Sequence, residues 1–171
     1  MARKPQILVA GSSEEHCNEK ECELAYQVGR EIALRGAVLI TGGLGGVMEA
    51  SSKGAHEAGG LVVAILPQED TYHANPYCDV VVATGIGWAR NFATAYTADA
   101  VIIVGGGAGT AIEAMVAYFK EKPIIALKGS GGFADRFAGE YLDDRKLVKV
   151  IPAETPREAV ELALKMLKGR S

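Results

Sequence analysis

Short apolar runs alternate with longer amphipathic segments along the chain, and this alternation predicts strands separated by helices. Strands are expected at residues 6–10, 37–41, 61–66, 80–83, 100–104, 124–127 and 147–150. Helices are expected near 21–35, 47–58, 110–121 and 133–141, in a segment that ends near 98, and from Pro156 to about 167. The polar stretch 68–79 is expected to run over the surface.

The expected strands are almost continuously apolar, which indicates that both faces of the sheet are covered. Together with the intervening helices, this predicts a parallel sheet in a three-layer α/β/α arrangement, a Rossmann-like doubly wound fold. A chain of 171 residues is most simply one domain, so residues 1–171 are predicted to form a single Rossmann-like domain.

Ligands of such folds bind beyond the carboxyl ends of the strands, where the strand order reverses. In the strand order 3-2-1-4-5-6, that point lies between the first and the fourth strand. The loops that meet there would be 12–13, 41–46, 84–91 and 105–110. We therefore expect a ligand cleft formed by these loops.

Two glycine-rich segments share one pattern. The sequence G-G-x-G-[G/T]-x-x-E-A is found at residues 42–50 and 106–114, and each copy follows an apolar strand. Glycine lets backbone N–H groups approach an anion closely, and a helix N-terminus adds partial positive charge. The loops therefore predict a phosphate site, with turn formation and close packing as the alternative. Neither loop has the dinucleotide fingerprint G-x-G-x-x-G or the P-loop spacing G-x-x-x-x-G-K-[S/T].

The charged and aromatic side chains near these loops allow both functional and structural interpretations. Arg90 is either a ligand for phosphate or carboxylate in a strand-end loop, or a surface residue at a helix start. Glu113 is expected in the first helical turn, where it either takes part in chemistry or completes a capping box with Thr110. Glu49 is expected in the first turn of helix 47–58, where the helix dipole favours an acidic side chain. Trp88 is either a core or rim aromatic, which we favour, or a stacking surface for a base.

Composition and charge narrow the classes of partner. The net charge of −3 and the lack of a basic stripe argue against a nucleic-acid surface. No apolar run approaches the roughly 20 residues that a membrane helix needs. The charged N-terminus leads directly into a strand, which is not the pattern of a signal peptide. We therefore expect a cytoplasmic protein with no nucleic-acid and no membrane partner.

The cysteines Cys17, Cys22 and Cys78 are odd in number and match no zinc spacing, so no metal site is predicted. Cys17 and Cys22 are expected as reduced thiols near a loop and a helix start. That interpretation is preferred to a metal site that includes the adjacent His16.

The second glycine-rich segment resembles the motif P-G-G-x-G-T-x-x-E of the LOG-like family. Members of this family were described earlier as possible lysine decarboxylases and are related to the DNA-processing DprA proteins. Residues 105–113 match every defined place of the motif except the first, where Gly105 replaces Pro. Residues 41–49 are similar to the family motif G-G-G-x-x-G-L-M-G. The resemblance extends from Gly11 to about Leu127.

Within this family, residues 85–91 and 104–110 make the chain most similar to the branch of molybdenum cofactor carrier proteins. The resemblance implies a phosphorylated small-molecule ligand, no required cofactor, and a homo-dimer or higher homo-oligomer. Plant-type LOG enzymes cleave the N-glycosidic bond of nucleoside 5′-monophosphates with an Arg and the motif Glu, which correspond to Arg90 and Glu113. Those enzymes usually have Arg-Lys where this chain has Arg90 and Asn91. This difference and the replacement of proline by Gly105 argue against hydrolase activity, and they do not affect the predicted anion site.

Two functions are consistent with these residues. The first is a carrier-like protein that binds a nucleotide-like or pterin-like ligand, a nucleoside monophosphate or a molybdopterin-type cofactor, and releases it unchanged. The second is a nucleoside 5′-monophosphate phosphoribohydrolase, in which Glu113 stabilises an oxocarbenium-like transition state and Arg90 orients the substrate. A lysine decarboxylase has no support, because no pyridoxal-phosphate lysine site is recognisable. The expected ligand contacts are Gly11, Ser12, Ser13, Gly42, Gly43, Gly45, Gly46, Arg90, Asn91, Gly106, Gly107, Gly109, Thr110 and Glu113.

Overall fold

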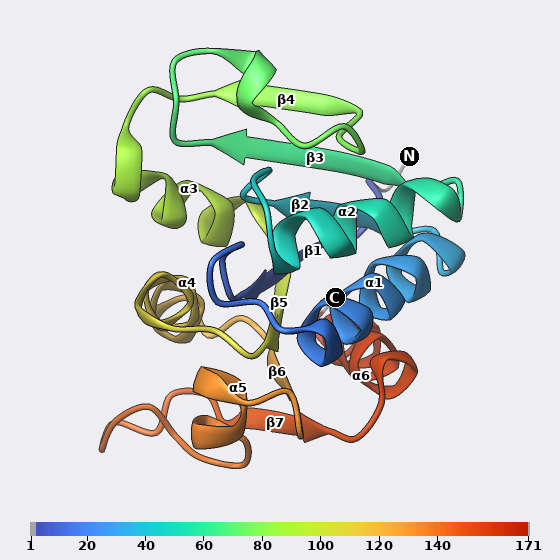
Figure 1. The fold of residues 1–171 in the computed structure, drawn as a ribbon. Helices are drawn as coiled ribbons and strands as arrows, with labels where there is room; N and C mark the ends of the chain where they lie inside the picture. Colours follow the sequence, from blue (N-terminus) through green and yellow to red (C-terminus); the bar gives the residue numbers. More distant parts are fainter. Residues whose placement is uncertain (1–2, 171) are drawn as a thin grey trace.

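Parallel strands and connecting helices build the fold in the computed structural model, which describes residues 3–170 (Figure 1). The strands are β1 (Gln6–Gly11), β2 (Val38–Thr41), β3 (Leu61–Leu66), β4 (Val80–Ala83), β5 (Ala100–Val104), β6 (Ile124–Leu127) and β7 (Val150–Ala153). The α-helices are α1 (Glu19–Leu34), α2 (Val47–Glu57), α3 (Arg90–Thr97), α4 (Ala108–Phe119), α5 (Gly132–Phe137) and α6 (Pro156–Lys168). Two short 3₁₀ helices are η1 (Thr71–His73) and η2 (Gly87–Ala89).

All neighbouring strands of the 7-stranded sheet pair in parallel, in the order β4-β3-β2-β1-β5-β6-β7. The predicted Rossmann-like α/β fold is therefore confirmed. The expected strand order was wrong in one respect, because β4 extends the sheet beyond β3 and does not pair with β1. The exposed side chains of Val80 and Val82 are consistent with this edge position. The order consequently reverses between β1 and β5.

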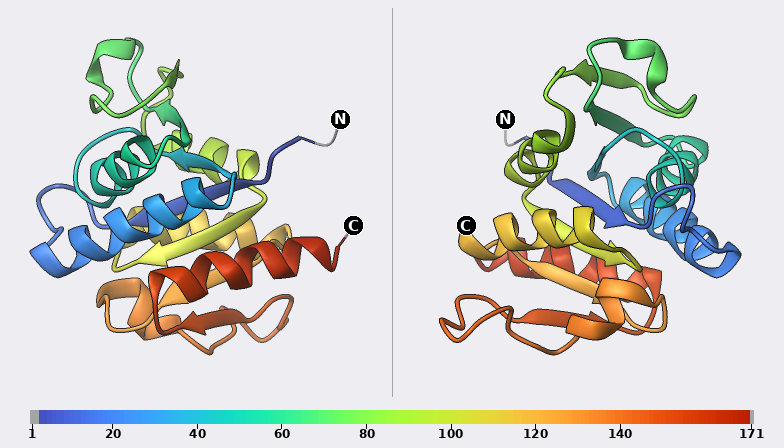
Figure 2. Two further views of the ribbon diagram at one scale, coloured as in Figure 1. Left: turned by 90° about the vertical axis from the view of Figure 1, so that its right-hand side faces the viewer. Right: turned by 60° about the vertical axis from the view of Figure 1, so that its left-hand side comes forward.

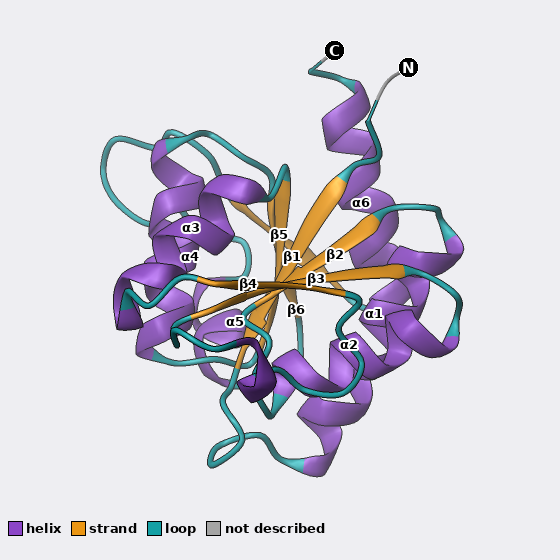
Figure 3. Ribbon diagram, turned by 90° about the horizontal axis from the view of Figure 1, so that it is seen from above, coloured by secondary structure: helices purple, strands orange, loops and turns teal. Residues whose placement is uncertain are grey.

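Two layers of helices cover the sheet (Figure 3). One core cluster joins alternate strand residues to α1, α2 and α6, and the other joins the remaining strand residues to α3, α4 and α5. Figure 2 shows α1 (blue) and α6 (red) across one face, and α4 (gold) across the other. Because both sheet faces are buried, the central strands carry apolar side chains at consecutive positions, which made them recognisable from the sequence.

Near the C-terminus two predicted boundaries were wrong. The last strand covers 150–153 and not 147–150, and its Pro152 pairs in register with Ala126 of β6. Proline is tolerated there because β7 is an edge strand with one side free of ladder hydrogen bonds. Helix α5 ends at Phe137, ahead of the expected 141, and Gly139 follows with a φ of 85°. The other predicted helices and strands are present with small shifts of their ends.

Helices α1 and α2 pack closely because each contributes a glycine at the contact. A Cβ atom built on Gly29 of α1 would lie 1.9 Å from the carbonyl oxygen of Ser51. A Cβ atom built on Gly54 of α2 would lie 1.9 Å from the carbonyl oxygen of Tyr26. Real Cβ atoms do not approach a carbonyl oxygen so closely, so any larger residue would push the two helices apart.

We predict that Gly54→Ala destabilises the protein by about 2 kcal/mol or more, because the helices must separate to admit the methyl group. At an exposed helix position, replacing glycine by alanine would stabilise the protein by roughly 1 kcal/mol. The sign of the change in unfolding free energy therefore shows whether packing dominates. Urea denaturation followed by circular dichroism measures it. The exposed neighbour Lys53→Ala serves as control and should stay within about 0.5 kcal/mol of the wild type. A stabilised Gly54→Ala variant would contradict the prediction.

Candidate functional site

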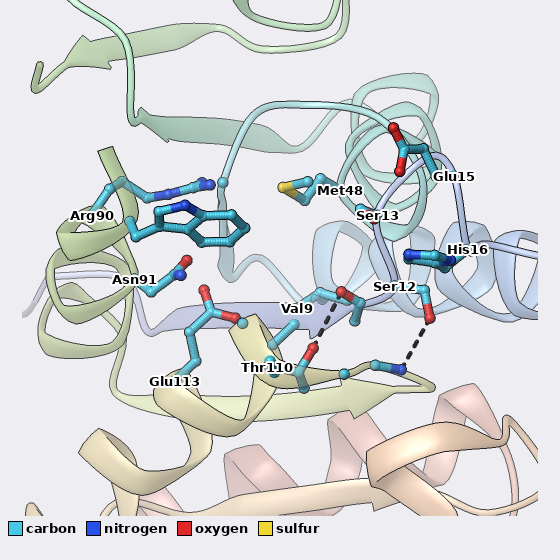
Figure 4. Close-up of a pocket in the computed structure, with 18 residues that line it drawn as sticks. Val9, Ser12, Ser13, Glu15, His16, Met48, Arg90, Asn91, Thr110 and Glu113 are labelled. Atoms are coloured by element: carbon cyan, nitrogen blue, oxygen red, sulfur yellow. Dashed lines mark hydrogen bonds between the residues drawn. The ribbon is translucent and has the colours of Figure 1, made fainter. Parts of the chain in front are cut away.

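A cavity of about 510 Å³ opens at the carboxyl ends of the central strands, where the strand order reverses. Most of the expected ligand contacts line it, namely Gly11, Ser12, Ser13, Gly42, Arg90, Asn91, Gly106, Gly107, Gly109, Thr110 and Glu113. The loops that follow β1, β2 and β5 therefore meet as expected, although β4 lies at the far edge of the sheet. Helix α3 returns from that edge and carries Arg90 and Asn91 to the cavity (Figure 4).

Three of the expected contacts, Gly43, Gly45 and Gly46, lie outside the cavity lining. A Cβ atom on Gly43 would collide with Ala64 of β3, and one on Gly46 would lie 2.5 Å from the carbonyl oxygen of Ser12. Gly43 and Gly46 also have φ angles of 78° and 68°, which favour glycine. Close packing and turn geometry account for these glycines without a ligand.

The glycine-rich loop after β5 turns its carbonyl groups toward α5. The carbonyl oxygens of Gly105 and Gly106 accept hydrogen bonds from the N–H groups of Ala134 and Phe133, at 3.0 and 2.9 Å. The N–H of Gly105 donates to the Ser130 hydroxyl at 2.9 Å. The φ angles of 60° at Gly105 and 97° at Gly106 make these bonds possible. These hydrogen bonds to α5 and to Ser130 therefore fix the orientation of the peptide groups at Gly105 and Gly106.

The replacement of the family's proline by Gly105 has a structural explanation here. Proline holds φ near −65° and has no N–H group, so it could neither adopt the φ of 60° nor donate to Ser130. A Cβ atom at this position would also lie 1.7 Å from Oε1 of Glu21. The loop of this chain therefore requires glycine where the family motif has proline.

The start of α4 presents backbone N–H groups at the cavity. Within residues 3–170, the N–H groups of Gly107, Ala108, Gly109 and Thr110 have no hydrogen-bond partner, whereas the N–H of Ala111 is bonded to Gly107. Unpaired N–H groups and the helix dipole together produce positive potential at a helix start. The arrangement is suited to binding an anion such as a phosphate group.

Ser12 connects two loops beneath these amides. Its hydroxyl donates to Oε1 of Glu21 at 2.8 Å and accepts from the N–H of Gly106 at 3.0 Å. Ser12 is buried, and Figure 4 shows its bond to the glycine-rich loop. Its hydroxyl therefore positions the loop after β5, in addition to lining the cavity.

Glu113 does not cap α4, so the capping-box interpretation was wrong. The helix begins at Ala108, which puts Thr110 in the first turn and Glu113 in the second. The Thr110 hydroxyl donates to the carbonyl oxygen of Gly11 at 3.2 Å. Glu113 is buried at the cavity, and its Oε1 accepts a hydrogen bond from the Thr94 hydroxyl at 2.7 Å. Its side chain is thus available to the cavity.

Arg90 is buried, so the interpretation as a surface residue was also wrong. Its Nη1 donates to the carbonyl oxygen of Ile65 at 3.1 Å, and a Cβ atom on Gly42 would lie 1.9 Å from the same nitrogen. Gly42 is therefore needed to make room for the guanidinium. The Nε of Arg90 is buried without a partner among residues 3–170, which leaves a donor for a ligand.

Burial shifts the pKa values of Arg90 and Glu113 in the directions that favour their neutral forms. Desolvation lowers the pKa of Arg90 below its ordinary value, against the opposing charge of Glu113. Desolvation raises the pKa of Glu113 to about 7, against the Thr94 hydrogen bond and the charge of Arg90. Near neutral pH the Glu113 carboxyl is therefore present in both its protonated and its ionised form, and it can donate or accept a proton.

Trp88 lies at the rim of the cavity and not in the core, with an exposed fraction of 78%. A Cβ atom built on Gly109 would lie 3.9 Å from Cζ3 of Trp88 and 3.7 Å from Nδ2 of Asn91. The indole thus stands beside the first turn of α4. An exposed aromatic ring next to unpaired N–H groups can bind a planar ring that carries an anionic group.

Sequence reasoning missed several lining residues, including Glu15 and His16 in the loop after β1 and Met48 in α2. Figure 4 shows Glu15 and His16 at the opposite end of the cavity from Arg90 and Asn91. The signal that could have identified Glu15 and His16 is their position just beyond the first strand, at the edge of the sheet already expected to hold the cleft.

The expected reduced state of two cysteines was also wrong, because a disulfide joins Cys17 and Cys22. Helix α1 begins at Glu19, earlier than expected, with Asn18 as its N-cap. Cys17 precedes the N-cap and Cys22 lies in the first turn, so the two Cα atoms are 6.1 Å apart. Cys78 is a free cysteine.

Neither a metal cluster nor a membrane span is found in the part of the chain that the structure describes. Residues 3–170 contain no group of three or more His, Cys, Asp or Glu side chains that could hold a metal ion. None of the helices in that range has the length and apolar character needed to cross a membrane.

We predict that Glu113→Gln changes the pH dependence of stability. Because the folded protein holds the Glu113 proton up to about pH 7, this group stabilises the fold fully below pH 4.5, and the contribution is lost as the pH rises through about 7. Glutamine does not ionise, so its contribution to stability does not fall with pH. Between about pH 5 and pH 8 the variant should therefore gain stability relative to the wild type, by up to roughly 3 kcal/mol. Urea denaturation at several pH values measures the difference. Glu49→Gln, outside the cavity, is the matched control, and a pH-independent difference for Glu113→Gln would contradict the prediction.

Comparison with known proteins places this site in a family context. The model of the SLOG cluster4 family matches residues 4–160. A protein of Archaeoglobus fulgidus is 50% identical over 123 residues, which cover 72% of this chain and 80% of that protein. The cytokinin riboside 5′-monophosphate phosphoribohydrolase of Mycobacterium tuberculosis is 34% identical over 121 residues, which cover 65% of this chain and 64% of the enzyme.

Solved structures agree with these matches. The molybdenum cofactor binding protein of Rippkaea orientalis superimposes with a TM-score of 0.86 at 35% identity, over 98% of this chain and 99% of that one. The molybdenum cofactor carrier protein of Chlamydomonas reinhardtii gives a TM-score of 0.81 at 32% identity, over 98% and 99% of the two chains. DNA processing protein A of Helicobacter pylori shares the fold, with a TM-score of 0.70 at 18% identity over 95% of this chain and 81% of that one. The resemblance predicted from the glycine-rich motifs is confirmed, and the chain belongs to the SLOG cluster4 family.

Proposed function

We propose that the cavity binds a phosphorylated nucleotide-like or pterin-like ligand and releases it unchanged. The observation that carries this proposal is the set of unpaired N–H groups at residues 107–110, at the start of α4. These groups would hold the phosphate. A cavity of about 510 Å³ is in the size range of small-molecule sites, so the rest of a mononucleotide-sized ligand has room beside it.

Side chains beside the start of α4 supply contacts for the planar part of the ligand. The indole of Trp88 and the thioether of Met48 offer apolar surface, and the unpaired Nε of Arg90 offers a donor. A ligand held by both sets of groups would be oriented by its phosphate at the amides and by its ring at these side chains. The similarity to proteins that bind or carry the molybdenum cofactor supports a pterin-like ring as one candidate.

A second function, hydrolysis of the N-glycosidic bond of a nucleoside 5′-monophosphate, is favoured by one observation. Arg90 and Glu113 line the same cavity, and the pKa of Glu113 is raised to about 7. Such a carboxyl could stabilise an oxocarbenium-like transition state when ionised and position a water molecule. The similarity to a phosphoribohydrolase supports this alternative, whereas Asn91 and Gly105 depart from the enzyme pattern.

Incubation with AMP distinguishes the two functions. We expect AMP to bind and to remain intact, with no free adenine and no ribose 5-phosphate detectable by chromatography. If the wild type releases both products and a folded Glu113→Gln variant does not, the protein is a phosphoribohydrolase and the carrier proposal is wrong. Absence of binding for AMP and for phosphorylated pterins would refute both.

The backbone site itself can be tested with Ala108→Pro. Ala108 is the first residue of α4, a position that tolerates proline, so the change removes one unpaired N–H and keeps the helix. A hydrogen bond to a charged group contributes about 1.5–3 kcal/mol, so affinity for AMP should fall roughly tenfold or more. Ala108→Ser keeps the N–H and is the control. Equal affinities of the two variants, measured by calorimetry with unchanged thermal stability, would contradict the proposal.

The expected homo-oligomer is proposed to form through α3 and α4. Phe92 and Tyr96 are spaced by one helical turn on α3, as are Met115 and Phe119 on α4, and all four are about half exposed. The two helices lie side by side on one face of the sheet (Figure 1). An exposed apolar stripe of this kind is typical of a surface that another molecule covers.

We predict that Met115→Glu shifts the protein toward the monomer, because burial of an unpaired carboxylate in an apolar interface is unfavourable. Sedimentation velocity compares it with Leu61→Glu, an exposed apolar residue on a different element. A wild type that is monomeric at all concentrations would end this proposal.

A further inference from the structure

The loop between β1 and α1 combines cavity contacts with a disulfide. Ser13, Glu15 and His16 line the cavity, and Figure 4 shows these side chains on the loop that borders it. Cys17 follows directly and is joined to Cys22 near the start of α1. The covalent bond therefore holds the end of a loop whose preceding residues form one wall of the cavity.

Hydrogen bonds link the same helix start to the glycine-rich loop. Glu21, next to Cys22, accepts hydrogen bonds from the N–H of Asn18 at 3.0 Å and from the hydroxyl of Ser12 at 2.8 Å. Ser12 in turn accepts from the N–H of Gly106 at 3.0 Å. A change in the order of the loop would thus reach both the wall of the cavity and the support of its anion-binding amides.

We infer that Cys17 and Cys22 form a reversible redox site that controls the order of loop 13–17 and, through it, the affinity of the cavity. The affinity part of this inference rests on the proposed binding function. Reduction by a dithiol breaks the S–S bond. The dithiol supplies two electrons and two protons and becomes a disulfide, while Cys17 and Cys22 become thiols.

Within residues 13–17, backbone hydrogen bonds remain after reduction. The N–H groups of His16 and Cys17 donate to the carbonyl oxygen of Ser13, at 3.0 and 2.9 Å. Ser13 and His16 are exposed, so these bonds compete with water. The open loop samples more conformations, and a ligand that needs the closed wall must order it on binding. Reduction therefore weakens binding.

The remaining cysteine is poorly suited to compete for the disulfide. Burial raises the pKa of Cys78 to about 11, and its Sγ lies 3.4 Å from Oδ1 of Asn75. A thiol that stays protonated is a weak nucleophile in disulfide exchange. Cys17, Cys22 and Cys78 are all half-buried, so exposure does not separate them.

Hydrogen exchange of the full chain tests the redox site without any ligand. Treatment with dithiothreitol should raise the thiols counted in denaturant from one to three, and exchange of a peptide covering residues 12–18 should become faster. Cys78→Ser should respond like the wild type. The double variant Cys17→Ser, Cys22→Ser should exchange fast with or without dithiothreitol. Equal exchange in the oxidised and reduced wild type, or three thiols in every redox buffer, would overturn the inference.

Calorimetry with AMP then tests the effect on the cavity. The reduced wild type should bind AMP more weakly than the oxidised protein, on the order of threefold to tenfold, which corresponds to ordering one or two side chains. Equal affinities would show that the disulfide is only structural. If AMP and inorganic phosphate bind in neither state, the proposed function fails, whereas hydrogen exchange still decides whether the redox site exists.

Discussion

The orientation of the peptide groups at Gly105 and Gly106 is the constraint on which the site depends. Their carbonyl oxygens accept hydrogen bonds from α5, and their N–H groups donate to Ser130 and Ser12. Buried backbone groups must be paired, so these bonds fix how the chain enters α4. The next N–H groups along the chain are then left without partners at the cavity. The short helix α5, which lines no part of the cavity, thus determines how the unpaired N–H groups of α4 face the cavity.

The burial of Arg90 and Glu113 is unfavourable for their charged forms. Both groups are removed from water, and each is shifted toward its neutral form in spite of the other's charge. Such groups are tolerated when their neighbours supply hydrogen bonds, as Ile65 does for Arg90 and Thr94 does for Glu113. The unpaired Nε of Arg90 is the exception, and it lies in a residue that lines the cavity.

Much of the fold could be predicted because the central strands are buried on both faces and therefore uniformly apolar. The glycine-rich loops indicated which edge of the sheet holds the cavity, because each directly follows a recognisable apolar strand, β2 or β5. The pairing of the strands was harder to predict, because the short β4 carries no sequence signal that places it beside β3 rather than β1. The first residue of a helix was decisive for Glu113, because a start at Ala108 removes this residue from the cap.

The division of the cavity between main chain and side chains has an evolutionary consequence. The N–H groups at the start of α4 belong to the backbone, so ordinary side-chain substitutions leave them in place. The neighbouring groups Arg90, Asn91 and Trp88 are side chains of η2 and α3 and can each be exchanged separately. A scaffold of this kind can keep its unpaired backbone N–H groups while mutation changes the chemistry of the side chains beside them.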